Sequence, residues 1–459
     1  MKKLHRIIAV TALVASATGA VAQNTQRGIS ERGIDGYRPT EQIVQRQAEF
    51  QDMKFGIFMH FGIYSMLGSG EWVLQTKAAN FEEYSHYAGA FYPSKFDASR
   101  WVAAVKASGA KYLTFTTRHH DGFSNFKTSW SDFNSVDATP FGRDIIKEIA
   151  EECHKQGIAI HFYYSLLDWG RDDYPRGWSG KNTGRPGWCG PETYFEFMKG
   201  QLTELLTNYG EIGCIWFDGH WDHQYDPDFN WHYDELYSLI HELQPNCLVA
   251  NNHHIDPIEG EDIQVFEREV PGENTTGWVK GGVSKTIPLE TCQTISKDWG
   301  YDLNDNVHMT PREVVRYLVG CAGLNANLLL NIGPRPDGTL PEKAVESLAE
   351  AGKWLATHGE AVYGTRSTLL PPQKWGYVTE NEKYVYLHLI PDMLAKTSFC
   401  NPSQGGSGEI FIPIPGLKPK SVTLLETGQP CKFKPSEQGV RIVVGEVPDS
   451  YDWIVKIER

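Results

Sequence analysis

The chain has 459 residues, so a large domain with a smaller companion is expected rather than one small module. Apolar residues make up 41% and aromatic residues 12%, enough for a packed core, which excludes a disordered chain or a peptide hormone. The formal net charge is −14 and basic residues form no cluster, so no nucleic-acid partner is expected. The 8 cysteines are too dilute for a disulfide scaffold and include no CxxC pair of the kind that holds zinc.

The first residues follow the pattern of an export signal. Basic residues at the start precede an apolar stretch at 7–17 that is too short to cross a bilayer, and small residues at 20–22 suit a cleavage site. We expect residues 1–22 to be a signal peptide and residues 23–37 to be a solvated linker. The mature protein is then expected to be soluble and periplasmic or secreted, without membrane insertion. A retained N-terminal membrane anchor is the alternative.

Short apolar runs alternate with helical patterns between residues 53 and 358. The runs, rich in β-forming residues, cover 55–61, 112–117, 158–165, 214–217, 247–250, 263–266, 290–295 and 327–332. Helical patterns occupy 97–109, 143–156, 191–209, 232–243, 311–322 and 341–358. This alternation predicts a parallel sheet, and eight strands favour a (β/α)8 TIM-like barrel over an open doubly wound sheet. No GxGxxG or GxxxxGK[ST] segment follows the first run, which removes the usual nucleotide-binding reason for an open sheet.

Individual residues mark the ends of several predicted helices. Thr310 is suited to cap a helix whose first residue is Pro311, and Glu313 completes a capping box. Gly109 and Gly157 are suited to end helices, because glycine adopts the left-handed conformation without strain.

After Gly364 the pattern changes to short alternating strands separated by turn-rich pieces. The strands are expected at 384–390, 409–414, 421–426, 440–444 and 453–457. They predict a C-terminal antiparallel β-sandwich at 361–459, after a catalytic (β/α)8-like barrel at 38–360. An oligomer is compatible with the sequence.

Polar residues at the ends of the predicted barrel strands are the candidate site, because such barrels keep their active sites at the carboxyl ends of the strands. The candidates are His60, Glu71, Trp72, His119, His120, Trp216, Asp218, His253, Glu267, Glu269 and Glu290. Carboxylates, imidazoles and indoles at one rim predict a sugar site, since indole faces stack on C–H-rich sugar surfaces and charged groups bind hydroxyls. The missing basic cluster argues against phosphorylated substrates.

Several segments between residues 52 and 364 resemble glycoside hydrolase family 29, the α-L-fucosidases. They are KFGIFMHFGIYS, GEWV, KYLTFTTRHHDGF, HFYYSLLDW, CIWFDG, ETCQTI followed by WGY, and NLLLNIGPRPDG. The resemblance implies the same two-domain fold and exo-acting release of terminal α-L-fucose from a glycan or glycoconjugate. It also implies net retention through a covalent fucosyl-enzyme intermediate, without a cofactor or metal. By motif it implies fucose contacts at His60, Glu71, Trp72, His119, His120 and Trp216, and the nucleophile at Asp218.

The residues themselves agree with Asp218 as the nucleophile. It ends an apolar run, and Gly219 lets the chain turn away without covering the carboxylate. Retaining cleavage needs such a carboxylate about 5 to 5.5 Å from a protonated carboxyl group. The bland alternative is an ordinary Asp-Gly turn.

The acid/base is predicted to be Glu267, because DIQVFEREVPG resembles the family segment that carries this residue. Glu269 remains an alternative, since residues two apart on a strand share a face and Arg268 would face the other way. Glu290 is the other alternative, although a supporting role fits it better. The acid needs a raised pKa, which an apolar wall such as Phe266 or Trp278 would provide.

One departure from the family pattern concerns His253. Many family members have an arginine there, and an imidazole does not replace a guanidinium fork without consequence. This predicts relaxed specificity toward a galactoside as well as a fucoside. Two other classes compete: a catalytically weak fucose-binding protein, and a zinc hydrolase using His119, His120, His253 and His254 with Asp218. Adjacent strand residues point to opposite faces, which argues against a metal shared by His119 and His120.

Overall fold

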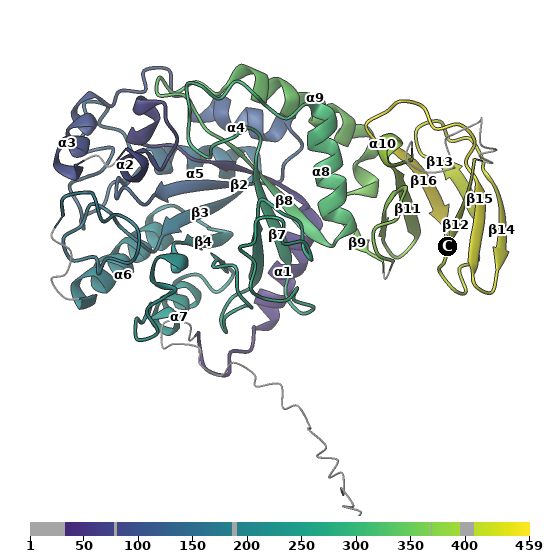
Figure 1. The fold of residues 1–459 in the computed structure, drawn as a ribbon, viewed down its shortest axis with the longest axis horizontal. Coiled ribbons are helices and arrows are strands. Elements are labelled where there is room, and N and C mark those ends of the chain that lie inside the picture. The colour runs from purple at the N-terminus through teal and green to yellow at the C-terminus, as the bar shows by residue number, and fades with distance from the viewer. Residues whose placement is uncertain (1–32, 78–79, 186–190, 369, 395–407) are drawn as a thin grey trace, which may run out of the picture.

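The computed structural model describes residues 33–77, 80–185, 191–368, 370–394 and 408–459, so the predicted signal peptide lies outside it. Its larger part is a closed barrel of parallel strands that follow one another around the ring in chain order (Figure 1). The strands are β1 (Phe55–Met59), β2 (Tyr112–Arg118), β3 (Ala159–Ser165), β4 (Cys214–Asp218), β5 (Leu248–Asn252), β6 (Ile263–Glu267), β7 (Leu289–Thr294) and β8 (Ala326–Ile332). This closed barrel confirms the predicted TIM-like fold. Its strands are buried on both faces, and such strands need continuous apolar runs in the sequence.

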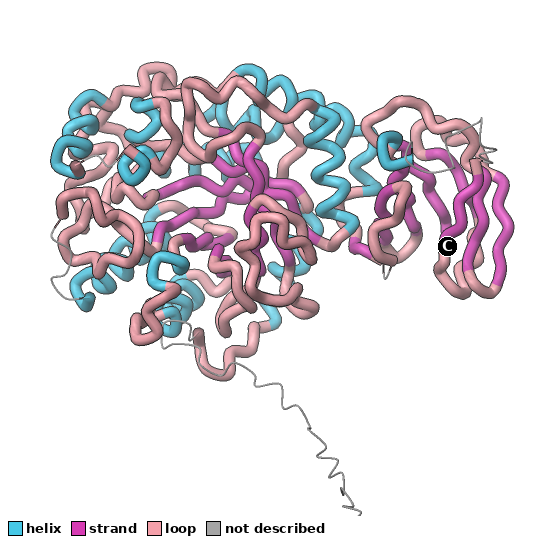
Figure 2. The backbone as a smooth tube through the Cα atoms, viewed as in Figure 1, coloured by secondary structure: helices cyan, strands magenta, loops and turns pink. Residues whose placement is uncertain are grey.

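Helices surround the barrel strands on the outside (Figure 2). The α-helices are α1 (Glu41–Met53), α2 (Val73–Thr76), α3 (Phe81–Ser85), α4 (Ala98–Ala107), α5 (Ile145–Gln156), α6 (Pro191–Asn208), α7 (Tyr233–Leu243), α8 (Pro311–Gly323), α9 (Glu342–His358) and α10 (Pro391–Leu394). The 3-10 helices are η2 (Ile63–Leu67), η3 (His86–Ala90), η4 (His220–His223) and η5 (Gly359–Ala361). The helices expected between strands correspond to α4 through α9. The connections 253–262 and 268–288, on either side of β6, are described throughout and contain no helix, so long loops reach the carboxyl end of the barrel there.

The predicted helix signals act as expected. The Thr310 side chain accepts from the backbone N–H of Glu313, and the Glu313 carboxylate accepts from the N–H of Thr310 at 2.7 Å, which completes the capping box before α8. Gly157 ends α5 in the left-handed conformation, and Gly109, also at positive φ, follows α4. These local choices fix where each helix starts and stops.

The amino end of the barrel is closed by α1. Ile43 and Phe50 of this helix belong to one apolar cluster with the inward side chains Phe58, Tyr163 and Trp216. A larger apolar cluster fills the space between the strands and the outer helices. The interior is therefore a packed core, and the carboxyl end is left for polar side chains.

The segment before α1 is tied to the barrel, although it was expected to be part of a solvated linker. The N–H of Ile34 donates to the carbonyl of Glu259 at 3.0 Å, and the Tyr37 hydroxyl donates to Oδ1 of Asp262 at 3.0 Å. Residues 33–37 thus lie against the loop that precedes β6.

Two antiparallel sheets follow the barrel; the one that contains β9 and β10 lies beside α8, and the other lies farther from the barrel (Figure 1). They contain β9 (Arg366–Ser367), β10 (Gly376–Glu380), β11 (Tyr384–Leu389), β12 (Glu409–Ile412), β13 (Ser421–Leu424), β14 (Lys432–Ser436), β15 (Gly439–Val443) and β16 (Trp453–Glu458). One sheet has the order β13-β16-β11-β10-β9 and the other β12-β15-β14. Side chains of both sheets, such as Leu387 and Ile412, share one apolar cluster, which is the packing of a sandwich. Against the barrel, Arg312 of α8 pairs with Asp449 at 2.6 Å.

The described cysteines are all free and buried, as expected of packing thiols. Within the described ranges, none of the helices combines the length and the apolar character that a bilayer-spanning segment needs.

Candidate active site

The carboxyl ends of the barrel strands surround a cavity of about 650 Å³. Most of the predicted site residues line it: His60, Glu71, Trp72, His119, Trp216, Asp218, His253 and Glu267. The other three predicted residues lie outside this lining: His120, Glu269 and Glu290. The strand register brings the central residues together, because Asp218 of β4 lies between Ser165 of β3 and Asn252 of β5.

Asp218 is held as a carboxylate by donors on several sides. The Tyr163 hydroxyl donates to Oδ2 at 3.0 Å, and Trp221 Nε1 donates to Oδ1 at 3.1 Å. Nε2 of His120 lies 3.4 Å from Oδ2. Burial favours the neutral acid, but hydrogen bonding and charge from His120, with the bonds from Trp221 and Tyr163, outweigh it and lower the pKa of Asp218. The side chain stays 14% exposed toward the cavity, so an ionised oxygen faces the space where a ligand would bind.

The pKa of Glu267 is shifted in the opposite direction to that of Asp218. This residue ends β6, and burial together with the negative charge of Asp218 raises the pKa of Glu267 to about 7. Nε2 of His254 lies 3.6 Å from its Oε2. A carboxyl group with this pKa is partly protonated near neutral pH and can give up a proton or accept one.

Asn252 links the two carboxyl groups. Its Nδ2 donates to Oδ1 of Asp218 at 3.3 Å and to Oε2 of Glu267 at 2.8 Å. These two oxygens are therefore no more than about 6 Å apart, an upper bound that is compatible with the spacing of about 5 to 5.5 Å in retaining glycosidases and lies below the 6.5 to 9.5 Å in inverting ones. One amide thus contacts both the anionic carboxylate and the partly protonated carboxyl group.

His60 is a neutral ring with a defined tautomer. Burial lowers the pKa of His60 to about 3. Its Nδ1 lies 2.8 Å from Oδ1 of Asn331, whose amide nitrogen donates to Thr294 and to the carbonyl of Trp299. Because that Asn331 oxygen only accepts, Nδ1 carries the hydrogen and Nε2 is left as an acceptor. Nε2 is suited to take the hydrogen of a ligand hydroxyl.

The two histidines after β2 have different tasks. His119 lines the cavity, and its Nδ1 has no hydrogen-bond partner among the described residues, while burial keeps the pKa of His119 well below its ordinary value. His120 lies behind it with Nδ1 2.7 Å from Ser165 Oγ. Ser165 donates its own hydrogen to the carbonyl of Leu167, so it accepts from His120 and directs Nε2 of that ring toward Asp218. His119 thus belongs to the cavity wall, and His120 acts on Asp218.

The rings of His119 and His120 lie only 4.1 Å apart at their centroids. The expectation that they point to opposite faces is wrong, because β2 ends at Arg118 and both residues belong to the turn after it. Within the described ranges, no group of three or more His, Cys, Asp or Glu side chains is placed to hold a metal ion.

Glu71, Trp72 and Trp216 form much of the inner wall. The N–H of Gly300 donates to Oε2 of Glu71 at 2.7 Å, and burial raises the pKa of Glu71. The Trp72 ring stacks on Trp221 with centroids 5.3 Å apart. Indole faces of this kind provide apolar surface for sugar C–H groups and for a methyl group.

Glu290 supports this wall from below. Its Oε1 accepts from Trp216 Nε1 at 2.9 Å and its Oε2 from the Tyr112 hydroxyl at 2.7 Å. Burial raises the pKa of Glu290 to about 7, but the side chain is 1% exposed and lies below the cavity lining. This placement fits the supporting role expected for Glu290.

Glu269 does not share a face with Glu267. The strand ends at Glu267, and Arg268 adopts φ 61°, so the chain turns there and the two-residue alternation stops. Glu269 is buried in the following loop, where Oε1 accepts from the Thr276 hydroxyl at 2.9 Å. Arg268, expected to face away, lines the cavity and lies over the Trp299 ring at 5.1 Å. The expected strand geometry is wrong here, because a left-handed residue at a strand end leaves no mark in a hydrophobic pattern.

His253 reaches the cavity wall, but both of its ring nitrogens have protein partners. Nε2 lies 2.9 and 3.0 Å from the two carboxylate oxygens of Glu261, and Nδ1 accepts from the N–H of Ile255 at 3.2 Å. A direct hydrogen bond to a sugar would have to displace one of them. The relaxed specificity expected from this residue stays a prediction.

Three residues around the carboxyl pair received no role from the sequence: Tyr163, Trp221 and Asn252. Tyr163 and Trp221 donate to Asp218, and Asn252 donates to both carboxyl groups. Asn252 sits at the end of the fifth apolar run, which is the one signal that could have found it. The contacts of the other two depend on how β3 and the turn after β4 meet in space.

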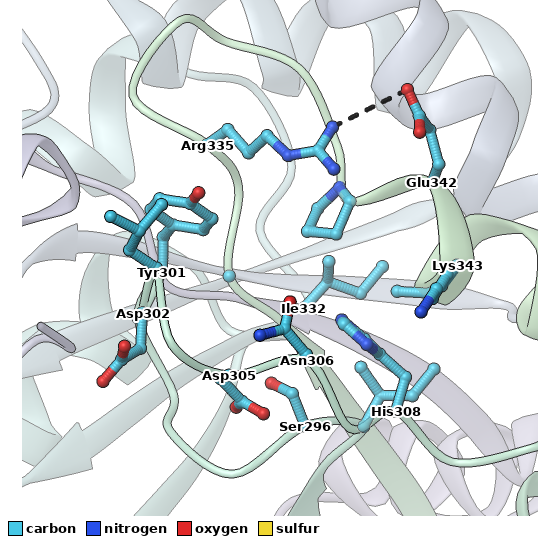
Figure 3. A pocket seen from close by; sticks show the side chains of 16 residues that line it. Ser296, Tyr301, Asp302, Asp305, Asn306, His308, Ile332, Arg335, Glu342 and Lys343 are labelled. Carbon is cyan, nitrogen blue, oxygen red and sulfur yellow. Dashed lines mark ion pairs between the residues drawn. The ribbon is translucent and has the colours of Figure 1, made fainter. Parts of the chain in front are cut away.

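A second, smaller cavity of about 170 Å³ lies between the loop after β7 and the start of α9 (Figure 3). Figure 3 shows His308 from that loop near Lys343, with Asp302 on the other side of the view. None of the predicted site residues is among the described residues that line it. Gly300 is shared between its wall and the hydrogen bond to Glu71, so the cavity lies behind the main one.

A closed (β/α)8-like barrel with paired carboxyl groups and an indole wall at its carboxyl end defines a glycoside hydrolase. The family whose model is described as alpha-L-fucosidase matches residues 26–360. The α-L-fucosidase of Dictyostelium discoideum is 30% identical over 397 residues, which are 78% of this chain and 81% of that protein. The chain belongs to the α-L-fucosidase family of glycoside hydrolases.

Solved structures agree with this assignment. Alpha-L-fucosidase isoenzyme 1 from Paenibacillus thiaminolyticus superposes with a TM-score of 0.78 at 30% identity, over 91% of this chain and 99% of that one. A family 29 α-L-fucosidase from Bacteroides thetaiotaomicron, trapped as a covalent intermediate with 2-fluoro-fucosyl fluoride, gives a TM-score of 0.77 at 23% identity. It covers 93% of this chain and 98% of its own, and it shares the fold.

Proposed function

We propose that this chain removes terminal α-L-fucose from glycans or glycoconjugates with net retention, through a covalent fucosyl-enzyme intermediate. Asp218 is the nucleophile and Glu267 the acid/base. The observation that carries the proposal is the Asn252 amide, which contacts both carboxyl groups and so limits their separation to about 6 Å. The pKa values of the pair are pushed in opposite directions, down for Asp218 and up to about 7 for Glu267, as the two roles demand.

In the first step, a carboxylate oxygen of Asp218 attacks the anomeric carbon of fucose. The bond from this carbon to the aglycone oxygen breaks, and that oxygen takes the proton of Glu267. His120, Tyr163 and Trp221 favour the anionic nucleophile before the attack. The aglycone leaves as an alcohol, and Glu267 is left as a carboxylate.

In the second step, Glu267 accepts a proton from water, and the water oxygen attacks the same carbon as the bond to Asp218 breaks. Ester formation has removed the negative charge of Asp218, which is the second-largest cause of the raised pKa of Glu267. The pKa of Glu267 therefore falls during the intermediate, when the residue must act as a base, and rises again when Asp218 is released. The coupling of the pair thus suits both halves of the reaction.

The fucose ring is expected to bind between the histidines and the indole wall. Nε2 of His60 is suited to accept from a sugar hydroxyl, and His119 lines the cavity beside it. Glu71 lines the same cavity with a raised pKa, while Trp72 and Trp216 supply apolar surface for the C5 methyl group.

The test is to trap the intermediate with 2-fluoro-α-L-fucosyl fluoride, measure the intact mass and map the labelled peptide. Covalent addition of one fluorofucosyl group at Asp218 is expected, because the fluorine slows the hydrolysis of the ester. A label on any other residue would overturn the assignment of the nucleophile. Full turnover without any label, in a chase with excess reagent, would overturn the double displacement.

A further inference from the structure

The cavity is too large for the proposed substrate residue alone. Its volume of about 650 Å³ lies within the range of about 300 to 1,000 Å³ in which proteins enclose drug-sized ligands, whereas fucose is a single small ring. The proposed fucose contacts lie at the inner end of the cavity, on residues that are almost fully buried, such as His60 and His119. Its outer part is bounded by exposed aromatic side chains, including Trp278, which is 44% exposed.

We propose that Trp278 forms a subsite for the next pyranose ring of the aglycone. This inference rests on the proposed function, because it uses Glu267 as the acid. The oxygen that leaves fucose must lie beside Glu267, so the ring attached to that oxygen lies on the same side of the cavity. Trp278 is on this side: its ring lies 5.7 Å from that of His254, and Nε2 of His254 lies 3.6 Å from Oε2 of Glu267.

The loop that carries Trp278 is held in place before any ligand binds. The buried Glu269 accepts from the hydroxyl of Thr276 at 2.9 Å and from its N–H at 3.3 Å. The N–H of Trp278 donates to that same Thr276 hydroxyl at 3.2 Å. Asn274 and Val279 exchange two hydrogen bonds across the turn, at 2.9 and 3.2 Å. Because the backbone of this loop is already held, little of its conformational freedom is lost when a sugar stacks on the indole.

Polar groups for the sugar hydroxyls lie next to the indole. Nζ of Lys280 donates to Oε1 of Gln224 at 2.8 Å, which links the loops after β4 and β6, and both side chains line the cavity. The N–H of Lys280 also donates to the carbonyl of His254 at 2.7 Å. The lysine has two further hydrogens and the glutamine amide has two, so the pair can donate to ring hydroxyls.

Another exposed indole of the lining, Trp178, is held differently. Trp178 is also exposed, at 42%, but its Nε1 donates to the carbonyl of Trp221 at 3.0 Å and its ring packs on Trp221 and Trp72. Through Trp221 this group of indoles contacts Asp218, so it is placed beside the proposed nucleophile. The aglycone subsite is therefore assigned to Trp278 and its loop, and not to every exposed indole at the rim.

The test compares two substrates that share fucose and differ in the aglycone. Alpha-L-fucosyl fluoride has no aglycone ring, whereas a fucosylated disaccharide has two. Trp278→Ala is expected to lower kcat/KM for the disaccharide substrate by about tenfold and to leave that for the fluoride within about twofold, while Trp278→Phe keeps most of the disaccharide activity. Trp130→Ala is the matched control, because Trp130 is 43% exposed and lies outside the cavity lining; neither substrate should respond.

Equal losses for both substrates in Trp278→Ala, or no loss for either, would overturn the subsite. The melting temperature of each variant is measured alongside, and Trp278→Phe provides the comparison if the alanine variant does not fold. Failure of the proposed function gives a different result, since the wild-type enzyme would then leave both fucosyl fluoride and the fucosylated disaccharide uncleaved.

Discussion

Two of the His–Asp pairs among the described residues lie in different surroundings. In the barrel, Nε2 of His120 lies 3.4 Å from Asp218, whose side chain is 14% exposed toward the cavity. In the C-terminal sheets, Nδ1 of His388 lies 2.6 Å from Asp452, and both side chains are fully enclosed. Nε2 of His388 is also engaged, 2.9 Å from the Thr379 hydroxyl. The same residue types thus support chemistry where one carboxylate oxygen reaches a cavity, and support only the fold where none does.

The largest effect is expected from Asp218→Ala. It removes the atom that bonds to the anomeric carbon, so kcat should fall by about 10⁴-fold or more. The measurement is steady-state turnover of an aryl fucoside, with circular dichroism to show that the barrel is folded. Partial rescue by azide, giving a fucosyl azide of inverted configuration, would confirm the role. Turnover within tenfold of wild type would contradict it.

Glu267→Ala is expected to have the next largest effect, and that effect should depend on the leaving group. Loss of a general acid costs about 10² to 10⁴-fold, and most where the departing oxygen needs the proton. The oligosaccharide substrate should therefore lose far more kcat/KM than an activated aryl fucoside. Equal losses for both substrates would mean that another group is the acid, with Glu269 and Glu290 as the residues to test next.

Asn252→Ala should change the pH dependence more than it changes the rate. With Glu267 as the proposed acid, kcat/KM is expected to fall above about pH 7 as Glu267 loses its proton, and to fall again at acid pH once Asp218 takes up a proton. The hydrogen bond from Asn252 holds the pKa of Glu267 down, so its loss should move the alkaline limb to higher pH. The profile is measured on the oligosaccharide substrate.

Asn251→Ala is the matched control for that profile. Asn251 is the preceding residue on β5, and its amide donates to the Tyr237 hydroxyl on the outer side of the strand. Its removal should leave the alkaline limb in place. A shift of equal size in both variants would mean that general loosening of β5, and not the bond to Glu267, moves the limb.

Asp452→Ala is expected to change turnover least. It leaves His388 buried without its partner, and breaking an enclosed pair costs about 3 to 5 kcal/mol of the free energy of unfolding. Denaturant unfolding should therefore show a loss of stability, while kcat/KM of the folded fraction stays within about twofold. A large fall in kcat/KM at full folding would mean that the sheets act on the active site.

The barrel was predictable because its strands are buried on both faces. Such strands read as continuous apolar runs, and capping residues such as Thr310 mark the helices between them. Among the elements that were not predicted are α1 and β14. The helix α1 is rich in glutamine and glutamate and has no clear apolar pattern, and β14 is mostly exposed and contains two lysines. These elements form because of their packing against the rest of the fold, and a local sequence pattern carries no information on that packing.

The candidate site was predictable at strand ends and less so beyond them. Asp218 and Glu267 each close an apolar run, so their common rim followed from the fold class. The Asn252 bridge depends on the register between β4 and β5 and on the proximity of β6. The turn at Arg268 depends on a left-handed residue. Neither the strand register nor this backbone conformation can be deduced from residue spacing. For that reason the sequence alone left Glu269 as an alternative acid/base.

The central claim is that the carboxyl groups of Asp218 and Glu267, both bonded to the Asn252 amide, cleave the fucosidic bond in two displacements. The most direct measurement is proton NMR of the reaction in its first minutes, before the released sugar mutarotates. Two inversions at the anomeric carbon predict that α-L-fucose appears first and the β-anomer only later. First appearance of β-L-fucose would show a single displacement and contradict the account.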